Sequence, residues 1–291
     1  MSENVHDAPP LVEADRATRI TDTDQVPEAG ASTSQPVYRR RFTVIYTLLA
    51  LVLGLGLGAL VVLIAKPDAG PAQVWSRWQP DGSDTARVRQ IADHVSTRYR
   101  FADGEQLVVA LAGPPTVTAG GGDQETNPIP VRAIAVRPDT STGKAEEDDI
   151  AIVDASKSMQ FVLCGLGDGC SISQGEASAA RHSLLRREAL ELSLYTFKYL
   201  DDVDSVTVFL PPPPGGETPG SAVFLRRSDV KDELSRPLGQ TLTPGGAPTI
   251  GGIPARELQT LNRITSSKLY RYEYTQAQDL SAVLVLDPII L

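Results

Sequence analysis

The sequence is poor in the residues that most often carry catalysis or hold transition metals. Its 291 residues include only 2 cysteines, 3 histidines, 2 tryptophans and 2 methionines. No metalloprotease, serine-hydrolase, phosphate-loop or dinucleotide-binding motif occurs in a suitable context. His6 lies near the N-terminus, and His94 and His182 fall on polar stretches of predicted helices. The sequence therefore favours a non-catalytic role over that of an enzyme, and we expect no cofactor.

Positive charge is also scarce. The chain carries 27 basic and 36 acidic residues, a net charge of −9 and an isoelectric point near 4.9. A role in binding nucleic acid therefore has no electrostatic support. Arginine far outnumbers lysine, and alanine, glycine and proline are abundant, which is typical of proteins from GC-rich bacterial genomes. A composition of 41% hydrophobic and 22% charged residues is that of a globular protein.

One long apolar run stands out against this background. Residues 42–65, FTVIYTLLALVLGLGLGALVVLIA, carry no charge and are long enough to cross a hydrocarbon layer of ~30 Å as a helix. Arg39, Arg40 and Arg41 precede the run, whereas only Lys66 follows it closely. The positive-inside rule then places the N-terminus in the cytoplasm and the rest of the chain outside. The run is too long and too far from the N-terminus for a cleaved signal peptide. We predict a basic flank and a single transmembrane helix over residues 39–65.

Two features flank or interrupt this predicted helix. Residues 1–38 are acidic, rich in proline and without apolar periodicity, so we expect a disordered cytoplasmic tail. Within the helix, Gly54 and Gly58 have the spacing that lets two membrane helices approach closely, which allows a homodimer. Glycine is also common in membrane helices for other reasons, so the spacing leaves both interpretations open.

The remaining chain predicts a juxtamembrane linker over residues 66–83 and a mixed α/β (α+β) extracytoplasmic domain over residues 84–291. Trp75 and Trp78 in the linker either lie at the membrane headgroups or pack into the domain. Periodicity and turn residues predict the helices and strands of the domain. The helices are expected at 84–99, 173–200, 228–236 and from Pro254, and the strands at 106–112, 131–137, 150–153, 159–164, 205–210, 221–225, 268–274 and 281–286.

A metal-ligand pattern follows the predicted strand 150–153. Asp154, Ser156 and Ser158 alternate along one loop, and Mg²⁺ or Mn²⁺ favours such hard oxygen ligands. The pattern resembles the metal-ion-dependent adhesion site of von Willebrand factor A domains. That resemblance implies a further threonine ligand from a glycine-rich loop, here Thr243 or Thr249. In that family a helix follows the motif directly, whereas residues 159–164 predict another strand. The alternative is a tight turn between two strands, and the sequence favours the turn.

Two other patterns concern packing and covalent structure. Cys164 and Cys170 flank the sequence GLGDG, and oxidising conditions outside the membrane favour a disulfide between them over a redox pair or free thiols. Tyr270, Tyr272 and Tyr274 alternate on one strand face, either as a packed cross-strand row or as a stacking platform for a sugar or peptide.

A weaker resemblance covers residues 187–210. Their predicted helix and following strand are similar to part of germination-protein-type extracytoplasmic domains. No function follows from it. We therefore expect a single-pass membrane protein whose outer domain binds or scaffolds an unidentified protein or envelope polymer at the bacterial cell envelope. The alternative is a divalent-metal-dependent ligand-binding module.

Overall fold

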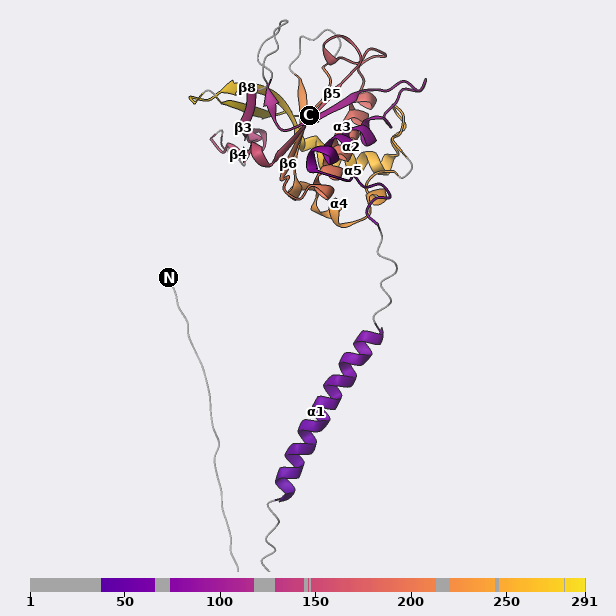
Figure 1. Ribbon diagram of the computed structural model, residues 1–291, viewed down its shortest axis with the longest axis vertical. Helices are drawn as coiled ribbons and strands as arrows, with labels where there is room; N and C mark the ends of the chain where they lie inside the picture. The colour runs from indigo at the N-terminus through magenta and orange to yellow at the C-terminus, as the bar shows by residue number, and fades with distance from the viewer. Residues whose placement is uncertain are drawn as a thin grey trace, which may run out of the picture. The chain divides into compact units, whose positions relative to one another are not determined.

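The computed structural model describes residues 38–65, 74–117, 129–143, 146, 148–212, 220–243, 246–279 and 281–290. The chain divides into two compact units, residues 1–69 and 70–291. The predicted disordered tail lies outside the described residues except for Tyr38. The first unit holds helix α1 (Tyr38–Ala65) (Figure 1). Its segment Arg41–Gly58 is long and apolar enough to cross a membrane, and no part of that segment is buried in the protein.

The second unit is the predicted mixed α/β domain, built on one nine-stranded sheet. Its strands are β1 (Val109–Gly113), β2 (Thr116–Val117), β3 (Ile129–Val136), β4 (Ala151–Asp154), β5 (Ser158–Cys164), β6 (Ser205–Phe209), β7 (Ser221–Arg226), β8 (Leu269–Gln276) and β9 (Ala282–Pro288). They lie in the order β1-β5-β6-β7-β8-β9-β3-β2, with β4 also paired to β3. Only the β3–β9 and β5–β6 pairs are parallel.

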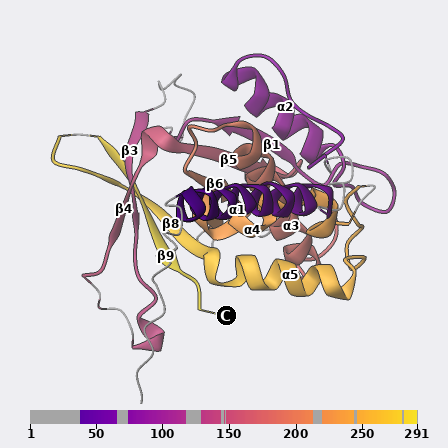
Figure 2. The same cartoon turned by 90° about the horizontal axis from the view of Figure 1, so that it is seen from below.

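Four helices accompany the sheet: α2 (Asp84–Ser96), α3 (Ala179–Tyr199), α4 (Lys231–Ser235) and α5 (Ala255–Thr265). Together with strands β1, β5, β6 and β7 they form the covered half of the domain (Figure 2). Side chains such as Phe161, Leu190 and Val206 meet there in a helix core. The long helix α3 is buried along most of its length, because the sheet, α2 and α5 all pack against it.

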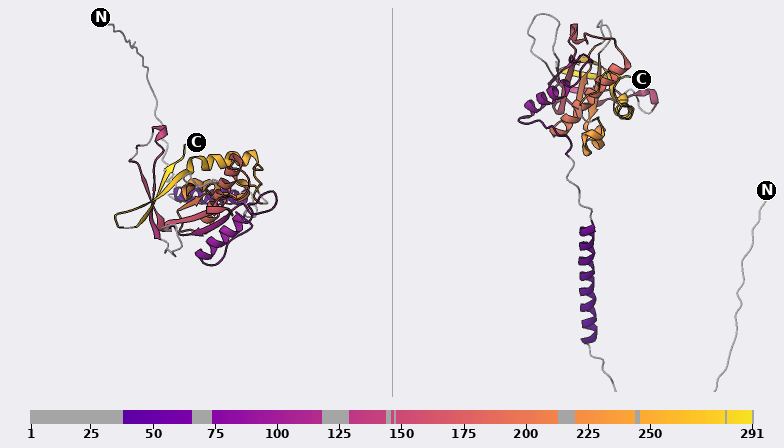
Figure 3. Two further views of the ribbon diagram at one scale, coloured as in Figure 1. Left: turned by 90° about the horizontal axis from the view of Figure 1, so that it is seen from above. Right: turned by 90° about the vertical axis from the view of Figure 1, so that its right-hand side faces the viewer.

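Strands β8, β9, β3 and β4 form the outer half, which twists away from the helices (Figures 2 and 3). Side chains on one face of this half, including Ile134, Leu284 and Tyr270, form a strand core with Phe209 and Phe224 from the covered half. Residues i and i+2 of a strand share a face. Strands β5 to β7 therefore supply alternate side chains to the two cores, which explains why apolar residues occupy both odd and even positions along them.

Several predicted boundaries were wrong. Helix α3 begins at Ala179, because Ser178 caps it by accepting a hydrogen bond from the Arg181 amide, and Gly175 before it has a left-handed backbone. Ser173 and Glu176 have the spacing of a capping box, on which the predicted start at residue 173 depends, but the helix does not begin there. The packed domain also includes Trp75, which is only 8% exposed, so residues assigned to the linker already belong to the fold.

Candidate functional site

The sequence DASKS, residues 154–158, forms a turn between two strands. The Oδ1 atom of Asp154 accepts the Ser156 amide at 2.9 Å, and residues Ala155–Lys157 form a single 3₁₀ turn. Hydrogen bonding by the Ser156 side chain and amide, together with the charge of Lys157, holds the pKa of Asp154 below its usual value. Strand β5 then starts at Ser158, so no helix follows the motif. The local structure is the tight turn that the sequence favoured.

The three proposed metal ligands differ in their exposure and in their hydrogen bonds. Asp154 and Ser156 are exposed, whereas Ser158 is buried. The Ser158 hydroxyl donates to the Asp154 carbonyl at 2.9 Å and lies 2.6 Å from the Ser205 hydroxyl in the interior. Thr243, one of the two threonines considered as a further ligand, donates its amide to Glu257 at 2.9 Å. Within the described residues, no group of three or more His, Cys, Asp or Glu side chains is placed to hold a metal.

The two cysteines lie at disulfide distance, with their Sγ atoms 2.06 Å apart. The loop between them is tight: the Gly165 amide donates to the Cys170 carbonyl, and the Gly167 amide to the Ser171 carbonyl, both at 2.8 Å. A Cβ atom on Gly165 would lie 2.2 Å from the Ser171 carbonyl oxygen, so glycine is required there. The pair therefore closes a compact loop at the end of β5, next to the edge strand β1.

The tyrosine row of β8 is packed rather than presented to solvent. Tyr270 is 8% exposed, and its ring lies edge-on to Phe224 at 6.1 Å. Tyr272 contacts Phe209 edge-on at 4.4 Å and Tyr274 at 6.2 Å. Burial raises the pKa of Tyr274 to about 12. These rings are part of the strand core.

The opposite face of the outer half is open and has an apolar centre. Pairing registers place Ile152 of β4, Ala135 of β3 and Val285 of β9 in one row across the strands. Ile152 is 68% exposed and Ile150, which precedes β4, is 44% exposed, whereas Val285 is only 7% exposed. Large apolar side chains exposed together are a recurrent mark of interaction surfaces. We call this face of β4, β3, β9 and β8 the outer face.

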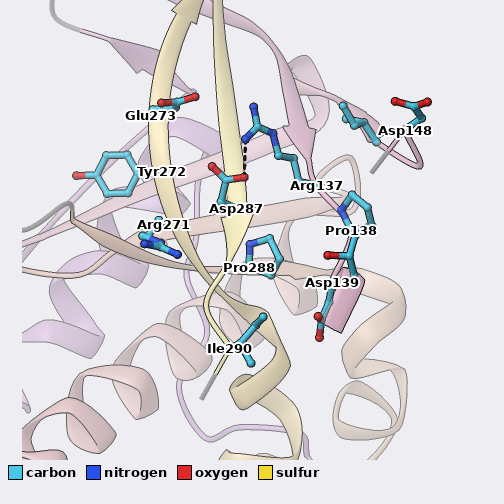
Figure 4. Close-up of a pocket in the computed structure, with 12 residues that line it drawn as sticks. Arg137, Pro138, Asp139, Asp148, Arg271, Tyr272, Glu273, Asp287, Pro288 and Ile290 are labelled. Carbon is cyan, nitrogen blue, oxygen red and sulfur yellow. Dashed lines mark hydrogen bonds and ion pairs between the residues drawn. The ribbon is translucent and has the colours of Figure 1, made fainter. Parts of the chain in front are cut away.

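A hollow of about 730 Å³ lies at one end of the outer face (Figure 4). Arg137, just after β3, is paired with Asp287 of β9 at 2.9 Å across its floor. Arg271 and Glu273 of β8 lie beside this pair, and Asp148, from the loop before β4, also lines the hollow. Ile150 and Ile290 also line the hollow. The hollow thus extends the apolar centre of the outer face, and charged groups of both signs line it.

Strand β4 forms the free edge of this surface. Among the described strands it pairs with β3 alone. Its neighbourhood is acidic, because Asp148, Asp149 and Asp154 are all exposed beside it. Lys157 lies 3.8 Å from Asp204 and so adds little net positive charge. An unpaired strand edge offers backbone donors and acceptors to an added strand, and this edge also offers apolar contacts and negative charge.

The two tryptophans pack on the covered half. The ring of Trp75 lies edge-on to Tyr195 at 5.3 Å and to Tyr199 at 5.8 Å, and its Nε1 atom donates to the Glu233 carbonyl. Trp78 stacks on His94 with ring centroids 3.8 Å apart. Of the two interpretations of these residues, the structure supports packing into the domain.

A network of buried charged groups lies beneath these rings. Arg187 of α3 bonds Glu191 at 3.1 Å and Glu257 of α5 at 2.5 Å. The Tyr99 hydroxyl donates to Glu191 at 2.7 Å, and Arg98 forms a further ion pair with the same carboxylate. Because burial penalises the phenolate and Glu191 lies beside it, the pKa of Tyr99 is raised well above its usual value. The network joins α2, α3 and α5 through their polar side chains.

Sequence reasoning missed this network. Arg187, Glu188 and Glu191 fall in the middle of α3, where charged side chains usually indicate a solvent-facing stripe. Glu188 is fully buried, and its carboxyl oxygens have no hydrogen-bond partner among the described residues. Burial, and secondarily the charge of Glu191, raise the pKa of Glu188 well above its usual value. The spacing of Arg187 and Glu191, four residues apart on one helix, was the one available signal.

Comparison with known proteins adds no constraint: no family model, curated protein or solved structure matches this chain. The candidate site therefore rests on its own geometry.

Proposed function

We propose that this chain is a single-pass membrane protein whose domain lies outside the cytoplasm and binds a protein partner without catalysis. Helix α1 supports the anchor, because the described apolar side chains of its segment Arg41–Gly58 are exposed and a lipid phase accommodates such a helix. Arg41 at the start of the segment and the cysteine pair in the domain fit the proposed orientation.

The free edge β4 carries the binding proposal. An extended segment of the partner adds to β4 as a further strand, with alternate apolar side chains over Ile150 and Ile152. The acidic residues Asp148, Asp149 and Asp154 favour basic residues in that segment. The occupant is therefore a lysine- or arginine-rich extended protein segment. An envelope polymer without a peptide backbone makes no such strand pairing.

The proposed orientation is tested with cysteines introduced on either side of α1. In intact cells, a membrane-impermeant maleimide is expected to label Thr275→Cys in the domain but not Ser34→Cys in the tail. Lysis should then expose both positions. Labelling of Ser34→Cys alone in intact cells would reverse the orientation and remove the extracytoplasmic role.

The binding proposal is tested with two fluorescent peptides on the full chain in neutral detergent. One peptide alternates lysine with valine and the other glutamate with valine. The lysine peptide should bind more tightly, and Ile152→Lys should weaken it by about tenfold, because lysine blocks strand edges and repels the probe. Leu111→Lys on the other edge strand, β1, is the matched control, since Leu111 is 56% exposed. Equal binding of both peptides, or equal loss in both variants, would refute the β4 site.

A further inference from the structure

Two adjoining hollows lie on the covered half, away from the outer face. The smaller has a volume of about 400 Å³ and the larger about 580 Å³, and they share Gly239, Leu242 and Thr243 as lining residues. Val74, the first described residue after helix α1, lines the larger hollow. The Leu238 amide donates to the Trp75 carbonyl at 2.8 Å and holds the segment around Trp75 against the one around Leu238.

The charged groups that line these hollows are predominantly basic, although the chain as a whole is acidic. Arg236 and Arg256 line the smaller hollow, and Arg77 and Arg98 line the larger one. Among the described residues, the carboxylates that line the hollows are Glu257 in the smaller one and Glu191 in the larger one.

Both of those carboxylates are already neutralised. Glu257 and Glu191 are 6% and 3% exposed, and both bond the buried guanidinium of Arg187. Glu257 also accepts the Thr243 amide, and Glu191 also bonds Arg98. Their negative charge is therefore directed inward. Because Arg236 is itself paired with Glu233, the guanidinium of Arg256 supplies the uncompensated positive charge of the smaller hollow.

The arginines of the smaller hollow are arranged for an anion. Arg236 is held by Glu233 at 3.0 Å, and its Nε atom donates to the Thr241 hydroxyl at 3.3 Å. The Arg256 guanidinium is exposed and forms no ion pair within the part of the chain that the structure describes. The Thr260 hydroxyl lines the same hollow. Arginine side chains beside hydroxyl donors are a recurrent arrangement for phosphate recognition.

The larger hollow supplies a different surface. Trp75, Trp78 and Tyr195 line it, and Trp78 keeps part of its surface exposed. Aromatic rings beside a basic site suit a ligand that joins a phosphate to a less polar portion. Leu242 and Thr243 are common to both linings, so the two hollows adjoin at these residues.

We propose that these adjoining hollows bind a phosphate-bearing ligand, with the phosphate near Arg236 and Arg256 and the remainder against the aromatic rings. The phosphate belongs either to an anionic lipid headgroup or to a soluble phosphate compound. The lipid source rests on the proposed membrane anchor, whereas the soluble source does not. Neither depends on strand β4, so failure of this site leaves the peptide-binding proposal standing.

The experiment uses the full chain in neutral detergent and two probes. Inorganic pyrophosphate is titrated in one arm, and phosphatidylglycerol in mixed micelles, against phosphatidylcholine, in the other. Saturable binding in either arm is expected, and Arg256→Gln should weaken it by about tenfold or more, since a charge-assisted hydrogen bond is lost. The matched control is Arg271→Gln, because Arg271 is also exposed and lies on the outer face. Its affinity should equal that of the unaltered chain.

The outcomes separate the sources. Binding of phosphatidylglycerol alone assigns the site to a lipid headgroup, and binding of pyrophosphate assigns it to free phosphate chemistry. Saturable binding in neither arm overturns the proposal, as does an equal loss for Arg256→Gln and Arg271→Gln. Arg256 is exposed and its side chain has no hydrogen-bond partner in the described structure, so an unchanged melting temperature is expected and serves as the folding control.

Discussion

The covered half and the outer half of the domain differ in how many faces of their shared sheet are buried. Strands β5 to β7 are buried on both faces, by helices on one side and by the strand core on the other. Strands β4, β3, β9 and β8 bury one face and leave the other open, with Ile152 68% exposed. The covered half therefore supplies most of the stability. Substitutions on the open face of the outer half should lower the stability less than substitutions in the covered half. This face can therefore carry a binding surface.

Ion pairs show the same division. Arg187 and Glu191 in the covered half have side chains that are 1% and 4% exposed. Arg137 and Asp287 on the outer face have side chains that are 50% and 31% exposed. Loss of one partner from a buried pair leaves an unpaired charge in the interior, whereas water takes over when an exposed partner is lost.

The largest expected effect on stability comes from breaking the buried ion pairs of Arg187. Arg187→Met leaves Glu191 and Glu257 without their shared cation, and we expect a loss of ~3–5 kcal/mol in the free energy of unfolding. The matched change in the outer half, Arg137→Met, should cost less than ~1 kcal/mol. Urea denaturation of both variants measures the difference. Similar losses for the two variants would show that the covered half holds no special share of the stability.

A smaller effect is expected at the end of β5. Cys164→Ser with Cys170→Ser opens a loop of only 6 residues' separation, so little chain entropy is released, and the loss should stay below ~3 kcal/mol. The backbone hydrogen bonds of Gly165 and Gly167 are expected to keep the loop shape. Thermal melting of the double variant, compared with the unaltered chain with its disulfide intact, measures this loss. A larger loss than that of Arg187→Met would reverse the ranking.

The covered half should also respond to pH through His94. Burial, and secondarily the charge of Arg98, lower the pKa of His94 to about 4, against 6.5 in the unfolded chain. Between these values the unfolded state binds a proton that the folded state does not, so stability falls as the pH drops from 6.5 towards 4. His94→Phe keeps a ring against Trp78 but does not titrate. Urea midpoints from pH 7 to pH 4 should therefore fall less steeply for the variant, and parallel slopes would contradict the assignment.

The smallest effect is expected at the turn in the outer half. The Ser158 hydroxyl is engaged in the interior, so we expect millimolar Mg²⁺ or Mn²⁺ to leave the melting temperature unchanged relative to EDTA. Asp154→Ala should lower it only slightly, through loss of the hydrogen bond to the Ser156 amide. A metal-dependent rise in melting temperature that Asp154→Ala abolishes would instead establish the metal-dependent alternative.

Much of the fold was predictable because local signals agreed with the tertiary context. The apolar periodicity of residues 84–99 gave the buried face of α2, and the predicted strands 268–274 and 281–286 correspond to the paired strands β8 and β9. The start of α3 was not predictable, since Ser173 and Glu176 form a convincing capping box by sequence alone. The preference for Ser178 became apparent only in the structure, where Gly175 turns the chain and Arg181 binds the carbonyls of residues 174 and 175.

The sequence by itself determined the apolar helix, the strand that follows DASKS, and the pairing of the two cysteines, because each depends on residues close together in the chain. The tertiary structure alone decided that Arg187, Glu188 and Glu191 are buried, since helices α2 and α5 enclose α3 from distant parts of the sequence. It also decided that Ile152 lies on an open edge. Burial is a property of what packs against a residue, and neither hydrophobic pattern nor charge specifies which distant segment that is.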